Sequence, residues 1–204
     1  GVAEEIDRIY AFYKENGWKY QQYIACLDPL DEVRGKKRYS LAPNQYGEFL
    51  VRLFELWYED WKEGKQPYIR QFDNYIGILM GYLPEACDQR GICGIQNVVE
   101  ADGSVYPCDF YMLDKYRLGN FNIDRLTEID KRRKAIGFVE RSMLQPKECV
   151  ACSYYRLCRG GCQRHRDYDT QSETYHNYFC ESYRMFFRQC GKKLKEVAEK
   201  MQSM

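Results

Sequence analysis

The sequence predicts a mixed α+β fold with helices toward both ends of the chain and a cysteine-organised region in its later part. A helix, a short turn and a strand follow one another in the first 27 residues, which is the order of half a β/α repeat. Asp102-Gly103 stands between two β-rich runs, a signal for a hairpin with a type I′ turn. The stretch CVACSYYRLCRGGC, residues 149–162, is dense in cysteine and poor in apolar residues.

Hydrophobic periodicity and turn residues locate the individual elements. In the first predicted helix Ile6, Ile9, Tyr10 and Tyr13 share one face, and Asn16-Gly17 ends it. We expect helices over residues 3–15, 44–63, 71–82, 121–144 and 173–200, a strand over 18–27, a polar loop over 30–43 and a hairpin over 94–108. We expect the apolar side of the last helix to pack on the cysteine-rich region.

A single β/α unit cannot form a sheet alone, so the sequence indicates that a larger α/β body is missing. We expect a boundary near residue 84, where the texture of the sequence changes. Residues 1–84 would be an α/β remnant, and residues 85–204 would be a module organised by cysteine.

Composition restricts the partners and the compartment. The chain of 204 residues has 31 basic and 30 acidic residues, which argues against nucleic acid or an anionic membrane as the main partner. No apolar run approaches the roughly 18 residues of a membrane span, and no signal-peptide pattern opens the chain. We therefore expect a cytoplasmic monomer.

Cysteine usage favours metal ligation over disulfides. Secretion is not indicated, and a chain of this size can build an apolar core without disulfides. The ten cysteines are Cys26, Cys87, Cys93, Cys108, Cys149, Cys152, Cys158, Cys162, Cys180 and Cys190. Cys26 and Cys190 lie in apolar segments and are expected to be buried core thiols. The other eight fit two centres of four ligands, and spacing alone leaves structural zinc and iron–sulfur clusters open.

The spacing of seven cysteines resembles the SPASM signature, which is found at the C-terminus of many radical S-adenosylmethionine enzymes that modify peptides. The matching residues are Cys93, Cys108, Cys149, Cys152, Cys158, Cys162 and Cys180, with Gly103 before Cys108. More specifically, the chain is similar to anaerobic sulfatase-maturating enzymes. That similarity is found in CLDPL (26–30), LFELWYEDW (53–61), DGSVYPCDFYMLDKYRLGN (102–120) and CRGGC (158–162).

The resemblance implies two auxiliary 4Fe–4S clusters in a SPASM domain over residues 85–204. The first would be held by Cys87, Cys93, Cys108 and Cys162, and the second by Cys149, Cys152, Cys158 and Cys180. Asp109 would be the general base that takes the proton from the substrate, and Leu27 would pack on S-adenosylmethionine. From the residues alone, Asp109 is more simply a turn or cap residue.

In this family a partial β/α barrel carries a CxxxCxxC motif whose cluster cleaves S-adenosylmethionine, and the radical oxidises a sulfatase cysteine or serine to Cα-formylglycine. This sequence has no CxxxCxxC motif. We therefore expect the chain to be the C-terminal portion of such an enzyme, with residues 1–84 as the last piece of the barrel. We expect this portion to be inactive alone. In the isolated portion, zinc could occupy the cysteine thiolates. The alternatives are a zinc-stabilised regulatory module without catalysis and another SPASM enzyme that modifies peptides.

Two further features are read as structural. We expect His165 and His176 to be surface or loop residues, because the cysteines already fill two sites. We expect the basic run Lys131-Arg132-Arg133-Lys134 to be a solvated helix face.

Overall fold

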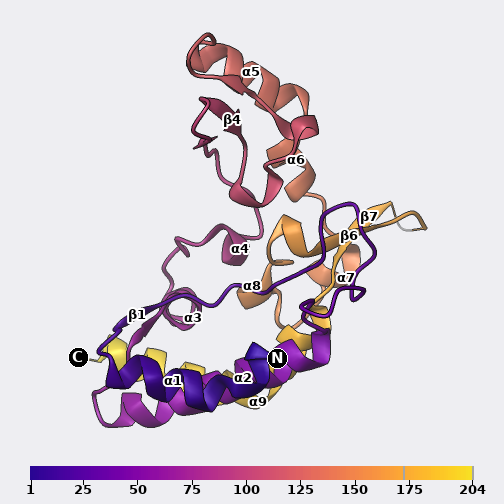
Figure 1. Cartoon of the computed structure of the whole chain (residues 1–204). Coiled ribbons are helices and arrows are strands. Elements are labelled where there is room, and N and C mark those ends of the chain that lie inside the picture. The colour runs from indigo at the N-terminus through magenta and orange to yellow at the C-terminus, as the bar shows by residue number, and fades with distance from the viewer. Residues whose placement is uncertain (172, 204) are drawn as a thin grey trace.

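The computed structural model describes residues 1–171 and 173–203, and it consists of a helical layer beneath a cysteine lobe (Figure 1). We define the helical layer as α1 (Ile6–Glu15), α2 (Pro43–Lys62), α3 (Arg70–Leu79) and α9 (Cys180–Gln202). We define the cysteine lobe as residues 87–179. A short 3-10 helix, η1 (Val2–Glu5), leads into α1. The predicted α+β class is confirmed.

Local signals set the ends of the first helices. α2 begins at Pro43, whose fixed φ suits a first helical position and whose missing N–H has no partner to lose there. After α2 the chain turns at Gly64, which has a φ of +70°. The predicted helices over 3–15, 44–63 and 71–82 are therefore found within about three residues at each end.

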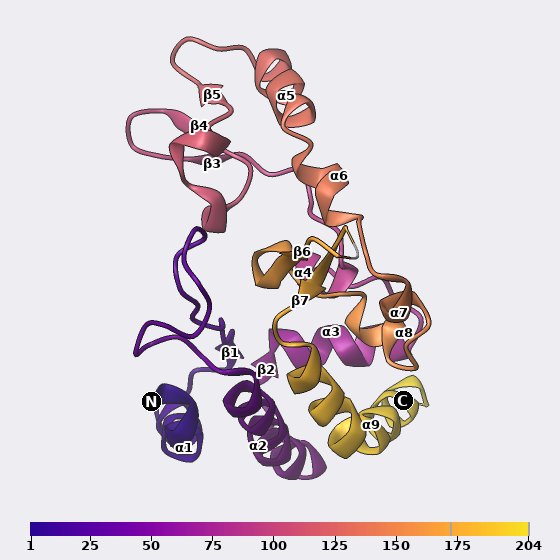
Figure 2. The same ribbon diagram turned by 90° about the vertical axis from the view of Figure 1, so that its right-hand side faces the viewer.

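The main hydrophobic core lies where α9 packs across α2 and α3 (Figure 2). Phe186 of α9 is fully buried, and its ring centroid lies 5.7 Å from that of Phe54 and 5.8 Å from that of Phe72. Only the edge of this helix reaches the cysteine lobe, for example where Phe187 contacts Tyr154 at 5.6 Å. The expectation that the apolar side of α9 packs on the cysteine-rich region is therefore wrong, because that side lies against the apolar faces of α2 and α3.

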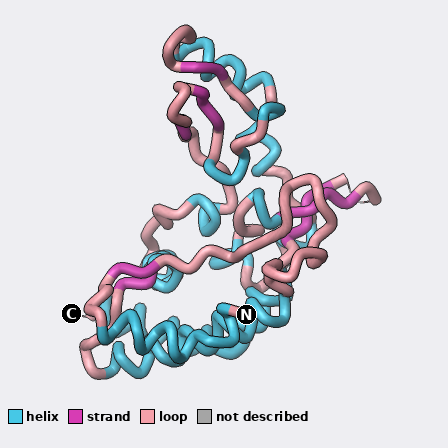
Figure 3. Tube along the Cα trace, in the orientation of Figure 1, coloured by secondary structure: helices cyan, strands magenta, loops and turns pink. Residues whose placement is uncertain are grey.

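The predicted strand over 18–27 is mostly irregular. Only β1 (Tyr20–Gln21) is paired, in parallel with β2 (Tyr68–Ile69), and the chain after Gln21 is drawn as loop in Figure 3. A strand needs a neighbour to bond its backbone, and the described chain supplies one for these two residues only. Cys26 is consequently exposed, which corrects its prediction as a core thiol, whereas Cys190 is buried as expected.

The cysteine lobe is built from short elements joined by turns. Its first part contains α4 (Cys87–Arg90), β3 (Val98–Val99), β4 (Ser104–Tyr106), η2 (Asp109–Tyr111), η3 (Asp114–Tyr116), β5 (Gly119–Asn120), α5 (Leu126–Ala135) and α6 (Phe138–Ser142). Its second part contains α7 (Lys147–Val150), α8 (Tyr155–Cys158), η4 (Gln163–His165), β6 (Arg166–Asp169) and β7 (Thr174–Asn177). Strands β3, β4 and β5 form one antiparallel sheet, and β6 and β7 form another.

Two predictions in this lobe need correction. The hairpin turn is not type I′: the N–H of Gly103 donates to the carbonyl of Glu100 at 2.9 Å, so Ala101 and Asp102 form the turn and Gly103 follows with a φ of +84°. The last helix begins at Cys180, not near residue 173, because residues Thr174–Asn177 pair with β6.

Two sequence-based readings of single residues also change. His165 is 7% exposed and packs edge-on against Phe179, so it is not a surface residue. Within the basic run, Arg133 is 3% exposed and bonds to Asn97, whereas Lys131 and Lys134 are exposed as expected. Within the described residues, no helix has the length and apolar character needed to cross a membrane.

Candidate metal centres

The eight cysteines predicted as ligands lie in or beside the short elements and turns of the lobe and at the start of α9. Cys87 opens α4, Cys108 follows β4, Cys158 ends α8, and Cys180 opens α9. Cys149 lies in α7, Cys162 precedes η4, and Cys93 and Cys152 lie in turns. All eight are free thiols and partly buried. The cysteine side chains therefore lie where separate segments of the chain meet.

Electrostatic interactions among the thiols separate them into two sets. The first set centres on Cys162, which interacts with Cys87, Cys93 and Cys108. These are residues far apart in sequence: Cys87 and Cys108 lie on either side of the β3–β4 hairpin, and Cys162 comes from the later loop. Cys162 therefore ties the hairpin to the cysteine-dense loop.

The second set centres on Cys158, which interacts with Cys149, Cys152 and Cys180. Cys149 also interacts with Cys152 and Cys180. The members come from α7, the turn after it, α8 and the start of α9. The N-terminal end of the longest helix is thereby attached to the lobe.

Burial controls the protonation of these thiols. It raises the pKa of Cys162 to about 12 and that of Cys158 to about 12, with neighbouring thiols adding to the shift. It also raises the pKa of Cys108, and the carboxylate of Asp109 adds to that effect. A soft metal binds the thiolate, so loading either set at neutral pH must release protons.

The donor sets suit a soft metal, because each consists of four thiols without an oxygen or nitrogen ligand among the named residues. Within the part of the chain that the structure describes, no three His, Cys, Asp or Glu side chains are close enough to hold a single metal ion. Electrostatic interactions link the thiols within each set, although no group of three among them has the arrangement that a single metal ion needs. In chemistry and in partial burial the residues fit a thiolate-ligated iron–sulfur cluster.

Asp109 is the first residue of η2 and is exposed beside the first set. Its Oδ1 accepts a hydrogen bond from the Cys108 thiol at 3.1 Å and another from the backbone N–H of Phe110 at 3.1 Å. The carboxylate is therefore held near Cys108 and remains open to solvent on its other side.

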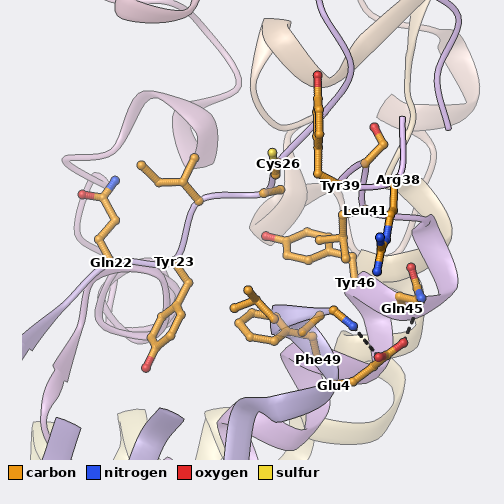
Figure 4. Close-up of a pocket in the computed structure, with 16 residues that line it drawn as sticks. Glu4, Gln22, Tyr23, Cys26, Arg38, Tyr39, Leu41, Gln45, Tyr46 and Phe49 are labelled. Atoms are coloured by element: carbon orange, nitrogen blue, oxygen red, sulfur yellow. Dashed lines mark hydrogen bonds and ion pairs between the residues drawn. The ribbon is translucent and has the colours of Figure 1, made fainter. Parts of the chain in front are cut away.

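A large apolar cavity lies at the edge of the helical layer, below the loop that contains Cys26 (Figure 4). It has a volume of about 680 Å³, and Tyr23, Tyr46 and Phe49 line one side of it. The side chain of Leu27 is partly buried and packs against the main core. Next to it Asp28 is fully buried, and its carboxylate accepts hydrogen bonds from the backbone of Gly35 and Lys37, both at 2.7 Å, which shapes the loop over 30–40.

Sequence reasoning missed the buried arginines Arg164 and Arg166. Arg164 donates a hydrogen bond to the carbonyl of Asp28, whereas Arg166 donates to carbonyls within the cysteine lobe. The sequence signal was the density of arginine and glycine in CRGGCQRHR, residues 158–166. Without the fold, this density of arginine and glycine is consistent both with a peptide-binding groove and with simple packing.

Comparison with known proteins agrees with the thiol chemistry. Residues 92–162 match the SPASM family, described as an iron–sulfur cluster-binding domain. The chain therefore contains a domain of this class, and it corresponds in sequence and fold to the C-terminal region of anaerobic sulfatase-maturating enzymes.

The similarity extends over nearly the whole chain. A cysteine-type anaerobic sulfatase-maturating enzyme of Clostridium perfringens (strain 13 / Type A) is 43% identical over 97% of this chain and 53% of its own length. A serine-type enzyme of Bacteroides thetaiotaomicron is 32% identical over 88% of this chain and 47% of its own. The solved structure of native anSMEcpe with bound AdoMet superimposes with a TM-score of 0.89 at 43% identity, covering 98% of this chain and 55% of that one. The chain thus spans about half the length of the curated relatives it matches.

Proposed function

We propose that this chain is the C-terminal part of a radical S-adenosylmethionine enzyme that oxidises an active-site cysteine of a sulfatase to Cα-formylglycine. The observation that carries the proposal is the division of eight partly buried thiols into two sets of four within a chain that is similar to sulfatase-maturating enzymes over 97% of its length. A related structure contains a bound Cp18Cys peptide, which supports a polypeptide substrate. The higher identity to cysteine-type relatives favours cysteine over serine.

Residues Cys87, Cys93, Cys108 and Cys162 would hold one 4Fe–4S cluster, and Cys149, Cys152, Cys158 and Cys180 would hold the other. When bound, such a cluster supplies a one-electron acceptor for the second electron that leaves the substrate. The division into a barrel remnant over residues 1–84 and a SPASM domain over 85–204 belongs to the same proposal, as does the packing of Leu27 on S-adenosylmethionine bound mainly by the preceding part of the enzyme.

Asp109 would act as the general base. In this role its carboxylate would take the proton from the substrate thiol as the Cβ–S bond gains double-bond character. The proposal is supported by its exposure to solvent beside Cys108. Water would then add to the thioaldehyde carbon, and hydrogen sulfide would leave, which completes the aldehyde.

In the full-length enzyme, Asp109→Asn should lower formylglycine formation by at least about hundredfold, the range over which a general base contributes. Iron and sulfide content should stay unchanged. Asp114→Asn, a change of the same chemistry at an exposed position in the next turn, should leave the rate within about twofold. Mass spectrometry of a sulfatase peptide measures the product, and full activity of Asp109→Asn would remove it as the base.

A second assay separates the proposed clusters from a zinc-stabilised module. Anaerobically purified protein should contain iron and acid-labile sulfide and should absorb in the visible region. This absorbance distinguishes the two alternatives, because zinc–thiolate sites lack it. Stoichiometric zinc without sulfide would favour the regulatory module. Peptides presenting cysteine, presenting serine, or from unrelated precursors would then test the substrate class.

A further inference from the structure

Arg166 is a buried arginine at the start of β6 and is 6% exposed. Its guanidinium donates hydrogen bonds to four backbone carbonyls: to Gly160 at 3.0 Å, Ser142 at 2.6 Å, Gly91 at 2.8 Å and Gly161 at 2.6 Å. These acceptors come from three separate segments of the lobe. One side chain therefore joins backbone that is otherwise connected only through long stretches of chain.

The segments bound by Arg166 are those that carry the proposed ligands. Gly160 and Gly161 lie between Cys158, of the second set, and Cys162, of the first. Gly91 lies two residues before Cys93, whose backbone N–H donates to the hydroxyl of Ser142 at 2.9 Å. The guanidinium thus holds ligand loops of both sets at a fixed distance from each other.

The charge of Arg166 acts on both sets as well. It interacts electrostatically with Cys93 and Cys162 of the first set and with Cys149 and Cys158 of the second. The four groups to which it donates are neutral carbonyls, and the carboxylate of the adjacent Asp167 pairs with Arg34 at 2.9 Å. Because arginine stays protonated, its positive charge is directed at the thiol sets.

We propose that Arg166 is a positioning residue shared by both auxiliary centres: it fixes the separation of their ligand loops and raises the reduction potentials of both clusters together. The inference rests on the proposed function, since it requires a cluster at each set. A fixed positive charge in a poorly solvated site stabilises the state that has gained an electron, so reduction becomes more favourable. The charge of Arg166 can therefore alter the reduction potentials without any change in the cysteines that bind the clusters.

The test is an EPR-monitored redox titration of the anaerobically purified full-length enzyme, with dithionite as the one-electron donor. Cys87→Ala and Cys152→Ala variants assign each signal to its thiol set. In Arg166→Gln, the equilibrium constant for reduction should fall about tenfold at both clusters, which is about 59 mV for a one-electron couple. Arg166→Lys keeps the charge and should stay within about twofold of wild type.

Two other arginines provide controls, because the strongest interactions that each makes with a thiol fall within one set. Arg164 interacts with Cys162, so Arg164→Gln should shift the first cluster alone. Arg184 interacts with Cys180 and Cys152, so Arg184→Gln should shift the second alone, and by less because it is exposed.

The proposal is overturned if Arg166→Gln leaves either potential in place. If Arg166→Gln loses its iron, the potentials of Arg166→Lys provide the test. A tenfold fall in the equilibrium constant for reduction at both clusters, with the positive charge retained, would exclude that charge as the cause. Iron and sulfide assays on the wild-type protein keep the two hypotheses apart. Absence of the clusters there contradicts the proposed function, whereas full clusters with unshifted potentials contradict only the role of Arg166.

Discussion

The helical layer and the cysteine lobe are held together by different forces. The helical layer contains a continuous apolar core with large, fully buried side chains: Leu50, Leu53, Phe54, Phe72, Phe186 and Leu194. In the cysteine lobe the separate apolar cluster consists of Val105, Leu118 and Ile129, with Ile136 packed against it. The lobe instead concentrates thiols, buried arginines and glycines with positive φ.

This difference indicates which region depends on bound metal. Burying a side chain such as Phe or Leu contributes about 1.5–3 kcal/mol, so the helical layer has a source of stability within its own sequence. The lobe has few such side chains, and hydrogen bonds to backbone carbonyls join its segments. Metal bound at the proposed ligands would therefore contribute folding free energy to the lobe far more than to the helices.

Removal of iron should destabilise the cysteine lobe as a whole and should leave the helical layer unaffected. After chelation of the full-length protein under oxidising conditions, amide exchange over residues 92–166 should speed up by at least about hundredfold, or about 2.8 kcal/mol of local stability. Amides in α2 should keep their protection. The measurement is hydrogen exchange followed by mass spectrometry. An equal increase in exchange in both regions would show that they do not differ in their dependence on metal.

Truncation of Phe186 should have the opposite regional pattern. Phe186→Ala removes a fully buried ring from the centre of the helical layer and should lower its local unfolding free energy by about 3–5 kcal/mol. Iron content should be retained. Phe121→Ala, at a ring that is 42% exposed, should change stability by less than about 0.5 kcal/mol. If Phe186→Ala lost iron while its helices stayed protected from exchange, the conclusion that Phe186 stabilises mainly the helical layer would be wrong.

Gly91 tests the close packing within the lobe. It has a φ of +70°, and a Cβ there would overlap the carbonyl oxygen of Arg159. Gly137, with a φ of +60°, has open space around it. Gly137→Ala should cost about 1–2 kcal/mol for the left-handed backbone. Gly91→Ala should cost more and should release iron, so the difference in unfolding free energy between the two variants measures the contact; equal costs would show that it is unimportant.

A partly buried carboxyl in the helical layer should give the smallest effect. Burial raises the pKa of Asp73 to about 6, while a hydrogen bond from the Ile69 N–H at 3.0 Å partly opposes the shift. The folded state then binds more protons than the unfolded state between about pH 4 and pH 6, so stability from this group falls as pH rises through that window. Asp73→Asn should flatten the slope relative to wild type, measured by denaturant titration at several pH values. An unchanged slope would exclude Asp73 as its source.

Much of this molecule follows from local sequence. The helices over residues 6–15, 43–62 and 70–79 were predictable because their apolar period, Pro43 and the glycines after their ends act within a few residues. The cysteine spacing also indicated two sets of four thiols before any fold was known, since ligand loops are short. Family resemblance, and not spacing, supplied the choice of iron–sulfur over zinc.

Only the tertiary structure decided which surfaces meet. Residues 174–177 share the period of the helix that follows them, yet they form β7 because β6 offers them backbone partners. α9 packs on α2, Cys26 is left exposed, and Arg166 joins carbonyls from three segments. Helix formation is governed by hydrogen bonds four residues apart, which a sequence displays. Strand pairing, burial and the environment of a charge depend on residues far away along the chain, which it does not.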